Sequence, residues 1–126
     1  MIKLEKQDVR LLADIGFLAL SYGHFDKAET IFKGVQVARP ESEAGPLGIA
    51  LTHLARGNVH ATVEALRKLP PSDSVRLYLA IALGRSGDKQ GAEELFQDLV
   101  KTAGRTAYAD IAASHLKILH DTTPLL

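Results

Sequence analysis

Apolar residues recur along this chain with the spacing of amphipathic helices, and glycine-containing turns separate the helical stretches. Three such turns stand out, Tyr22-Gly23-His24-Phe25, Arg56-Gly57-Asn58-Val59 and Ser86-Gly87-Asp88-Lys89. Glycine suits the left-handed backbone that ends a helix, and Asn58 and Asp88 suit the cap that begins the next one. Because each turn lies between two apolar stretches, the pattern predicts successive helix pairs.

The same periodicity places the ends of the predicted helices. Pro46 falls inside the third apolar stretch, where it removes an amide donor, so that helix is expected to start nearer Gly45. Pro70-Pro71 cuts the fourth helix short. We predict seven helices and no sheet, with the helices at Gln7–Tyr22, Phe25–Ala38, Glu43–Arg56, Val59–Leu69, Ser74–Ser86, Lys89–Ala103 and Arg105–His120.

Core positions recur in the three helix pairs. The first pair contains Leu12-x2-Ile15-Gly16-x2-Ala19 followed by Ala28-x3-Phe32, and Pro40 closes it. Small residues at Gly16, Ala19 and Ala28 allow the two helices to approach closely, and Leu12, Ile15 and Phe32 fill the space between them. The second and third pairs repeat the spacing as Pro46-x2-Ile49-Ala50-x2-His53 with Thr62-x3-Leu66, and Arg76-x2-Leu79-Ala80-x2-Leu83 with Ala92-x3-Phe96.

This spacing resembles the tetratricopeptide repeat. The resemblance implies an all-α, right-handed α-solenoid of three tetratricopeptide-like helix pairs with a C-terminal capping helix. We expect one domain over residues 1–126, with repeats at about 9–42, 43–72 and 73–104 and the capping helix at 105–120. The capping helix is expected to turn one apolar face inward, formed by Tyr108, Ile111, Ala112, His115 and Leu119.

Charge and composition narrow the classes of function. Lys plus Arg and Asp plus Glu are 15 each and interleave along the chain, which disfavours a nucleic-acid partner. No apolar run reaches the roughly 18 residues of a membrane-spanning helix. The charged stretch 1–10 lacks the apolar core of a secretory signal. We therefore expect a cytoplasmic protein without membrane insertion.

Candidate catalytic and metal-ligating residues form no recognisable motif. The chain has no cysteine, and its five histidines show no metal-ligand spacing. Gly84, Gly87 and Gly91 match neither a P-loop nor a dinucleotide fingerprint. We expect no cofactor, no metal and no enzymatic activity, and look instead for a binding surface.

In the tetratricopeptide family, the first helix of each pair lines a concave face. Carried over by repeat position, this lining comprises Arg10, Ala13, Phe17, Leu20 and Ser21, then Ala44, Leu47, Leu51, Leu54 and Ala55, then Ser74, Leu77, Ile81, Gly84 and Arg85. Its apolar members are expected to form an exposed strip, unless the terminal helix or a tight solenoid covers them. The expected partner-binding residues are Ala13, Phe17, Leu20, Leu47, Leu51, Leu54, Leu77, Ile81 and Arg85.

The small size, three repeats and apolar lining also resemble the type III secretion chaperones of this fold. That resemblance spans Asp8 to Leu119 and implies a chaperone that holds an amphipathic helix of an export substrate in an apolar groove. It also implies a small helical co-chaperone or a homodimer as further partners. The alternative is a general tetratricopeptide scaffold or adaptor within a multiprotein assembly.

Overall fold

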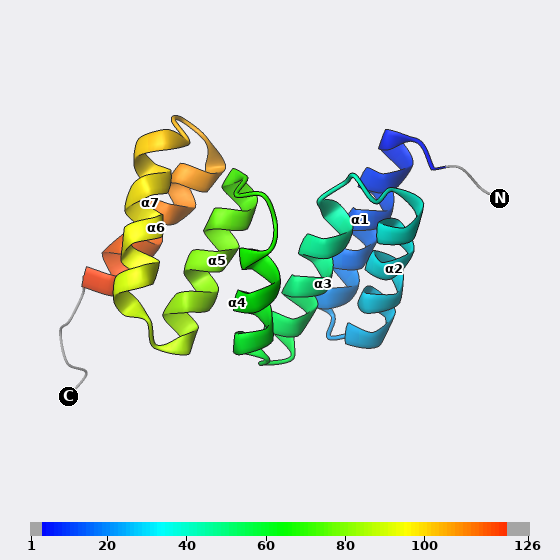
Figure 1. The fold of residues 1–126 in the computed structure, drawn as a ribbon, viewed down its shortest axis with the longest axis horizontal. Coiled ribbons are helices and arrows are strands. Elements are labelled where there is room, and N and C mark those ends of the chain that lie inside the picture. Colours follow the sequence, from blue (N-terminus) through cyan, green and yellow to red (C-terminus); the bar gives the residue numbers. More distant parts are fainter. Residues whose placement is uncertain (1–3, 121–126) are drawn as a thin grey trace. The chain divides into compact units, whose positions relative to one another are not determined.

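The computed structural model describes residues 4–120, and within them it contains seven helices and no strand (Figure 1). The all-α class and the seven predicted helices are confirmed, with every end within two residues of its predicted position. The helices are α1 (Lys6–Ser21), α2 (Phe25–Ala38), α3 (Ala44–Ala55), α4 (Val59–Arg67), α5 (Asp73–Ser86), α6 (Lys89–Thr102) and α7 (Ala107–His120).

The signals that placed the helix ends act largely as expected. Gly87 ends α5 with a φ of 95°, in the left-handed region that glycine adopts without a Cβ clash. Asp88 then accepts a hydrogen bond from the Gly91 amide, 2.9 Å away, and caps α6. Asn58 makes no such side-chain cap, so that part of the prediction is wrong. Pro46 lies in the first turn of α3, where its missing amide proton is not needed.

The chain divides into two compact units, Met1–Leu69 with α1 to α4 and Pro70–Leu126 with α5 to α7. The boundary falls at the Pro70-Pro71 pair, just after α4, which is the shortest of the seven described helices at nine residues. This confirms the expected shortening of the fourth helix. The assignment of the chain to one domain with repeats at 9–42, 43–72 and 73–104 stays a prediction.

In the first unit, α2 packs against both α1 and α3, and Phe32 is the centre of that contact. Phe32 is fully buried, with Ala13 and Ala28 beside it. A Cβ added to Gly16 would come within 2.5 Å of the Phe32 ring, and one added to Gly48 within 2.1 Å. The predicted roles of Gly16, Ala28 and Phe32 are therefore confirmed.

Two residues expected between helices of the first pair lie nearer to solvent. Ile15 is 43% exposed, so its predicted place in the core is wrong. Leu12 is only half-buried. Each residue of a helix points about 100° away from the one before it, and the contact with α2 falls on the side of Gly16 and Ala13 instead.

In the second unit, α6 packs between α5 and α7. Its buried side chains are Ala92, Phe96 and Leu99, and the buried side chains of α5 include Ala80 and Leu83. Of the face predicted for the capping helix, Ala112 is buried and His115 and Leu119 are half-buried, whereas Ile111 is 42% exposed. Tyr108 is exposed as well, and Ala109 is buried instead. The buried face of α7 is therefore formed by smaller residues than predicted.

The repeated core positions of the second helices agree in all three pairs. Ala28 and Phe32, Thr62 and Leu66, and Ala92 and Phe96 are each at most 2% exposed. Thr62, the polar member of this set, is satisfied because its hydroxyl donates to the Asn58 carbonyl at 2.9 Å. The spacing read from the sequence therefore identifies real core positions in α2, α4 and α6.

Candidate partner-binding site

The second unit contains a hollow between α5, α6 and α7. Its volume is about 210 Å³, and we call it the α5–α7 hollow. Apolar side chains from three helices dominate its lining, which comprises Ala80, Ile81, Gly84, Arg85, Phe96, His115, Ile118 and Leu119. Two of the predicted partner-binding residues, Ile81 and Arg85, are brought together there one helical turn apart on α5.

The local sequence of α5 explains how those two side chains are presented. Ser72 caps the helix by accepting a hydrogen bond from the Val75 amide at 3.3 Å, which fixes its start. Val75, Leu77, Ala80, Ala82 and Leu83 are buried along α5. Ile81 is half-buried and Arg85 is exposed, so α5 turns them away from its buried side.

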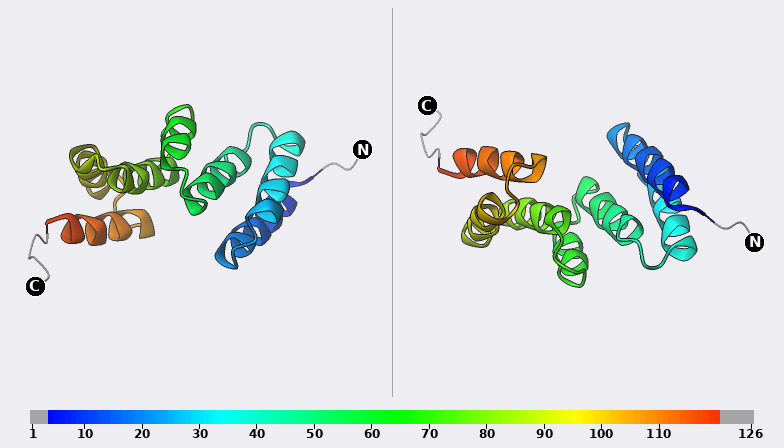
Figure 2. Two further views of the ribbon diagram at one scale, coloured as in Figure 1. Left: turned by 90° about the horizontal axis from the view of Figure 1, so that it is seen from below. Right: turned by 90° about the horizontal axis from the view of Figure 1, so that it is seen from above.

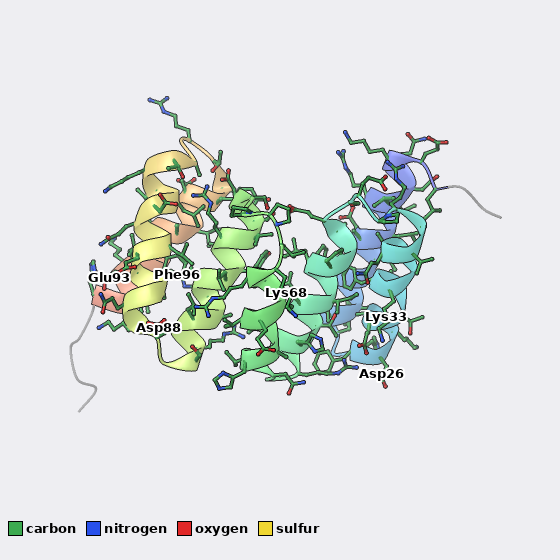
Figure 3. The ribbon with its side chains drawn as sticks, viewed as in Figure 1. Asp26, Lys33, Lys68, Asp88, Glu93 and Phe96 are labelled. Carbon is green, nitrogen blue, oxygen red and sulfur yellow. The ribbon has the colours of Figure 1, made fainter. Side chains whose placement is uncertain are left out.

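Phe96 and His115 form a stacked wall of the hollow. Phe96, labelled on α6 in Figure 3, has its ring centroid 5.0 Å from that of His115 and an angle of 2° between the two planes. Phe96 is 2% exposed, so its ring lies within the packed interior of the unit. Gly84 leaves the opposite side open, because an added Cβ would meet only Ala92, at 3.7 Å. Ile118, 68% exposed, lies at the rim.

The α5–α7 hollow carries a positive charge at its lining. Arg85 is the charged residue of the lining, and it forms no ion pair with any residue in the described range 4–120. An apolar hollow with an exposed guanidinium beside it suits an apolar side chain followed by a carboxylate or a carbonyl oxygen. An amphipathic helix offers both groups, because apolar side chains line one of its faces and polar groups lie along the edge of that face.

Most of the other predicted partner-binding residues are not accessible. Ala13, Leu47, Leu51, Leu54 and Leu77 are between 2% and 8% exposed, so the expectation of an exposed apolar strip is wrong for them. Phe17 and Leu20 are half-buried and pack against the Ala13, Ala28 and Phe32 cluster, with the Phe17 and Phe32 ring centroids 5.0 Å apart. Side chains committed to a core offer little surface to a partner.

Sequence reasoning missed the contribution of α7 to the hollow. His115 and Leu119 were assigned to the inward face of a capping helix, and Ile118 was given no role. The available signal was that Ile118 is a large apolar residue next to that face, one turn from His115 and Ser114. Only the packing of α7 on α6 brings it to the same hollow as Ile81.

Residues 4–120 contain neither a metal site nor a membrane-spanning helix. No group of three or more His, Asp or Glu side chains is positioned to hold a metal ion there. None of the helices in that range has the length and apolar character needed to cross a membrane.

Solved structures that share this all-helical fold over nearly the whole chain include PcrH and the translocator chaperone SycD. PcrH from Pseudomonas aeruginosa has 19% sequence identity and a TM-score of 0.73, and the match covers 92% of this chain and 94% of PcrH. The Yersinia enterocolitica type III secretion translocator chaperone SycD, in an alternative dimer, has 15% identity and a TM-score of 0.73 over 91% of this chain and 93% of SycD.

A third match is PcrH in complex with the chaperone binding region of PopD. It has 20% identity and a TM-score of 0.71, and it covers 94% of this chain and 96% of that chain. No protein-family model matches the sequence, and neither does any curated protein. At these identities the similarity establishes the fold, and the function has to be argued from the site.

Proposed function

We propose that the protein is a cytoplasmic type III secretion chaperone built of tetratricopeptide repeats, which binds an amphipathic helix of an export substrate. The observation that carries this proposal is the α5–α7 hollow, where Ile81 and Arg85 face an apolar cavity that nothing in the described chain fills. The shared fold of PcrH and SycD supports it, as does the PcrH complex with the chaperone binding region of PopD.

The physical role follows from the chemistry of such a substrate. An amphipathic helix released into the cytoplasm exposes its apolar face and tends to self-associate. Placing one large apolar side chain in the α5–α7 hollow removes it from water, and Arg85 at the rim pairs with an acceptor on the polar edge. The buried residues Leu47, Leu51, Leu54 and Leu77 then contribute stability to the receptor rather than contact area.

To test this, the protein is co-expressed with each export substrate of the host's own type III secretion system. Formation of a soluble complex is measured by size-exclusion chromatography with light scattering. Gly84→Leu fills the hollow and Arg85→Glu reverses its charge, and each should weaken binding by at least about tenfold while the far-UV spectrum stays helical. Val37→Glu, a change at an 82% exposed residue of α2, is the matched control and should bind normally.

Normal binding by both Gly84→Leu and Arg85→Glu would place the binding surface elsewhere and contradict the site. The solubility of the bound partner distinguishes a chaperone from a general scaffold. A chaperone should keep soluble a substrate that precipitates when expressed alone, and should itself gain thermal stability in the complex. A scaffold should bind partners that are already soluble without it.

A further inference from the structure

Two tyrosines, one on α5 and one on α7, extend the lining of the α5–α7 hollow. Tyr78 is half-buried, and Tyr108, near the start of α7, is 36% exposed. Each tyrosine continues a line of side chains that reaches the hollow, because residues three and four apart on a helix share a face. These lines are Tyr78, Ile81 and Arg85 on α5, and Tyr108, Ile111, His115 and Ile118 on α7.

The two tyrosines lie at the same end of this pair of helices. Short connections make α6 antiparallel to both α5 and α7, so those two helices run in the same direction (Figure 1). They lie side by side in both views of Figure 2 and are in contact. Tyr78 and Tyr108 therefore both precede the hollow, whereas Arg85 lies at its far end. The seven-residue step from Tyr78 to Arg85 corresponds to about 10 Å along the axis of α5.

The hydroxyl groups of both tyrosines are available to a ligand. Neither forms a hydrogen bond with any residue of the described range 4–120. Burial, as the larger cause, and the nearby phenol of Tyr108 raise the pKa of Tyr78 above its ordinary value of 10.0. The Tyr78 hydroxyl therefore keeps its proton at neutral pH, and it can donate as well as accept a hydrogen bond. A ligand that covered it without pairing with it would leave it unsatisfied, which weakens binding.

We propose that Tyr78 and Tyr108 determine which helix the α5–α7 hollow accepts, by selecting a hydrogen-bonding side chain two helical turns away from an acidic one. This inference rests on the proposed function, because it assigns the sequence pattern of the same bound helix. A large aliphatic side chain between the two enters the hollow beside Ile81, and the acidic side chain pairs with Arg85. An amide side chain of Asn or Gln suits the two phenols, since it both donates and accepts.

The spacing of this pattern follows from the rise of a partner helix that lies along α5. Both helices advance about 1.5 Å per residue, so the groups that meet Tyr78 and Arg85 are about seven residues apart in the partner. The aliphatic residue falls three or four positions from each of them, which keeps all three on one face. The bound segment is therefore identified by an amide, an aliphatic and an acidic residue at that spacing, in either chain direction.

The same arrangement should reject a helix that is apolar along its whole face. A leucine in place of the amide would cover both phenols and leave them without a hydrogen-bond partner, whereas an amide satisfies them. The tyrosines thus add a cost against wrong helices to the attraction that the hollow and Arg85 provide.

The pattern is tested with an array of overlapping peptides that span the export substrates of the host's own type III secretion system, each of about 20 residues and so several helical turns long. The fluorescently labelled full-length protein should bind peptides that contain the pattern. Replacing the acidic residue of such a peptide by lysine should weaken binding at least about tenfold. Replacing the amide by leucine should weaken binding about three- to tenfold.

The decisive comparison uses the chain that lacks both hydroxyls, Tyr78→Phe with Tyr108→Phe. It keeps both rings, so its melting temperature should be close to that of the wild type. It should bind the leucine peptide at least as tightly as the amide peptide, a loss of preference that a merely structural role would not produce. Tyr22→Phe removes a hydroxyl from the 72% exposed tyrosine that follows α1, and this matched control should keep the wild-type preference.

The outcomes separate this inference from the proposed function. The inference alone is overturned if the double variant still prefers the amide peptide as strongly as the wild type does, or if the bound peptides lack the pattern. It is also overturned if no peptide binds although the protein forms a soluble complex in co-expression. Failure of both the peptides and the co-expressed substrates to bind would overturn the proposed function as well.

Discussion

Helices α3 and α5 hold the same place in their repeats but have different surroundings. In the first unit, α3 packs against α1, α2 and α4, and Leu47, Leu51 and Leu54 are all buried. In the second unit, α5 packs mainly against α6 and only lightly against α7. There Leu77 is buried, but Ile81 is half-buried and Gly84, the counterpart of Leu54, is exposed. Equal positions in a repeat therefore differ in exposure because their neighbours differ.

Glycine explains much of this difference. Gly45 and Gly48 let α2 approach α3 so closely that an added Cβ would overlap Gln36 or Phe32. Gly84 on α5 has the reverse effect, because no neighbouring helix closes over it and it borders the α5–α7 hollow. Gly48 thus marks a tight contact in the first unit, whereas Gly84 borders an open cavity in the second.

The largest expected effect separates Leu51 from Ile81, which are equivalent in the repeat alignment. Leu51→Asp places a carboxylate at a buried site and removes packing, and should lower the free energy of unfolding by at least about 4 kcal/mol. Ile81→Asp leaves its carboxylate at a solvent-facing hollow near Arg85, and should cost about 1–2 kcal/mol. Urea unfolding followed by circular dichroism measures both.

Equal losses from Leu51→Asp and Ile81→Asp would mean that the two helices are buried alike, and the contrast between the units would be lost. A folded Leu51→Asp protein would return that residue to the accessible lining predicted from the repeat. The outcome thus decides whether exposure follows repeat position or local neighbours.

The success of the sequence reasoning depended on local signals. The turns at Gly23, Gly57 and Gly87 fixed the helix pairs, and the spacing of Ala28 with Phe32 identified core positions, because both follow from a few consecutive residues. The burial of Leu51 could not be read in this way. It depends on the packing of α1, α2 and α4 around α3, which a few consecutive residues do not determine.

The candidate site was only partly predictable for the same reason. Ile81 and Arg85 came from the repeat position, and the structure places both at the α5–α7 hollow. Ile118 belongs to a helix whose inward face was predicted one residue away from its actual position at the start of the helix, because Ala109 packs inward in place of Tyr108. Small residues carry a weak periodic signal, so the rotation of α7 about its axis was not fixed by the sequence.

A second pair of substitutions tests the two glycines directly. Gly48→Ala would put a Cβ 2.1 Å from the Phe32 ring and should cost about 1–3 kcal/mol of stability. Gly84→Ala meets only Ala92 at 3.7 Å, and the gain in helix propensity should stabilise the protein by up to about 1 kcal/mol. Thermal unfolding gives the sign of each change. A stabilising Gly48→Ala would show that α2 and α3 are not in close contact.

The smallest expected effect concerns ion pairs that join two helices within a unit. In the first unit, Arg56, which caps the end of α3, pairs with Asp26 and with Glu29 of α2, the latter at 3.1 Å (Asp26 is labelled in Figure 3). In the second unit, Arg76 of α5 pairs with Asp98 of α6. The hydrogen bond from Arg56, with help from Lys33, holds the pKa of Glu29 below its ordinary value of 4.5, although partial desolvation opposes this.

The direction of that shift sets the pH dependence. A folded-state pKa below the unfolded value means that Glu29 stabilises the fold above about pH 4.5, and that this contribution is lost as the pH falls through the folded pKa. Glu29→Gln should therefore lower the melting temperature by about 1–3 °C at pH 7 and have little effect at pH 3. Glu64→Gln, at an exposed residue of α4, is the control and should change neither value. A Glu29→Gln effect that persists undiminished at pH 3 would mean that packing, and not the ion pair with Arg56, accounts for the loss.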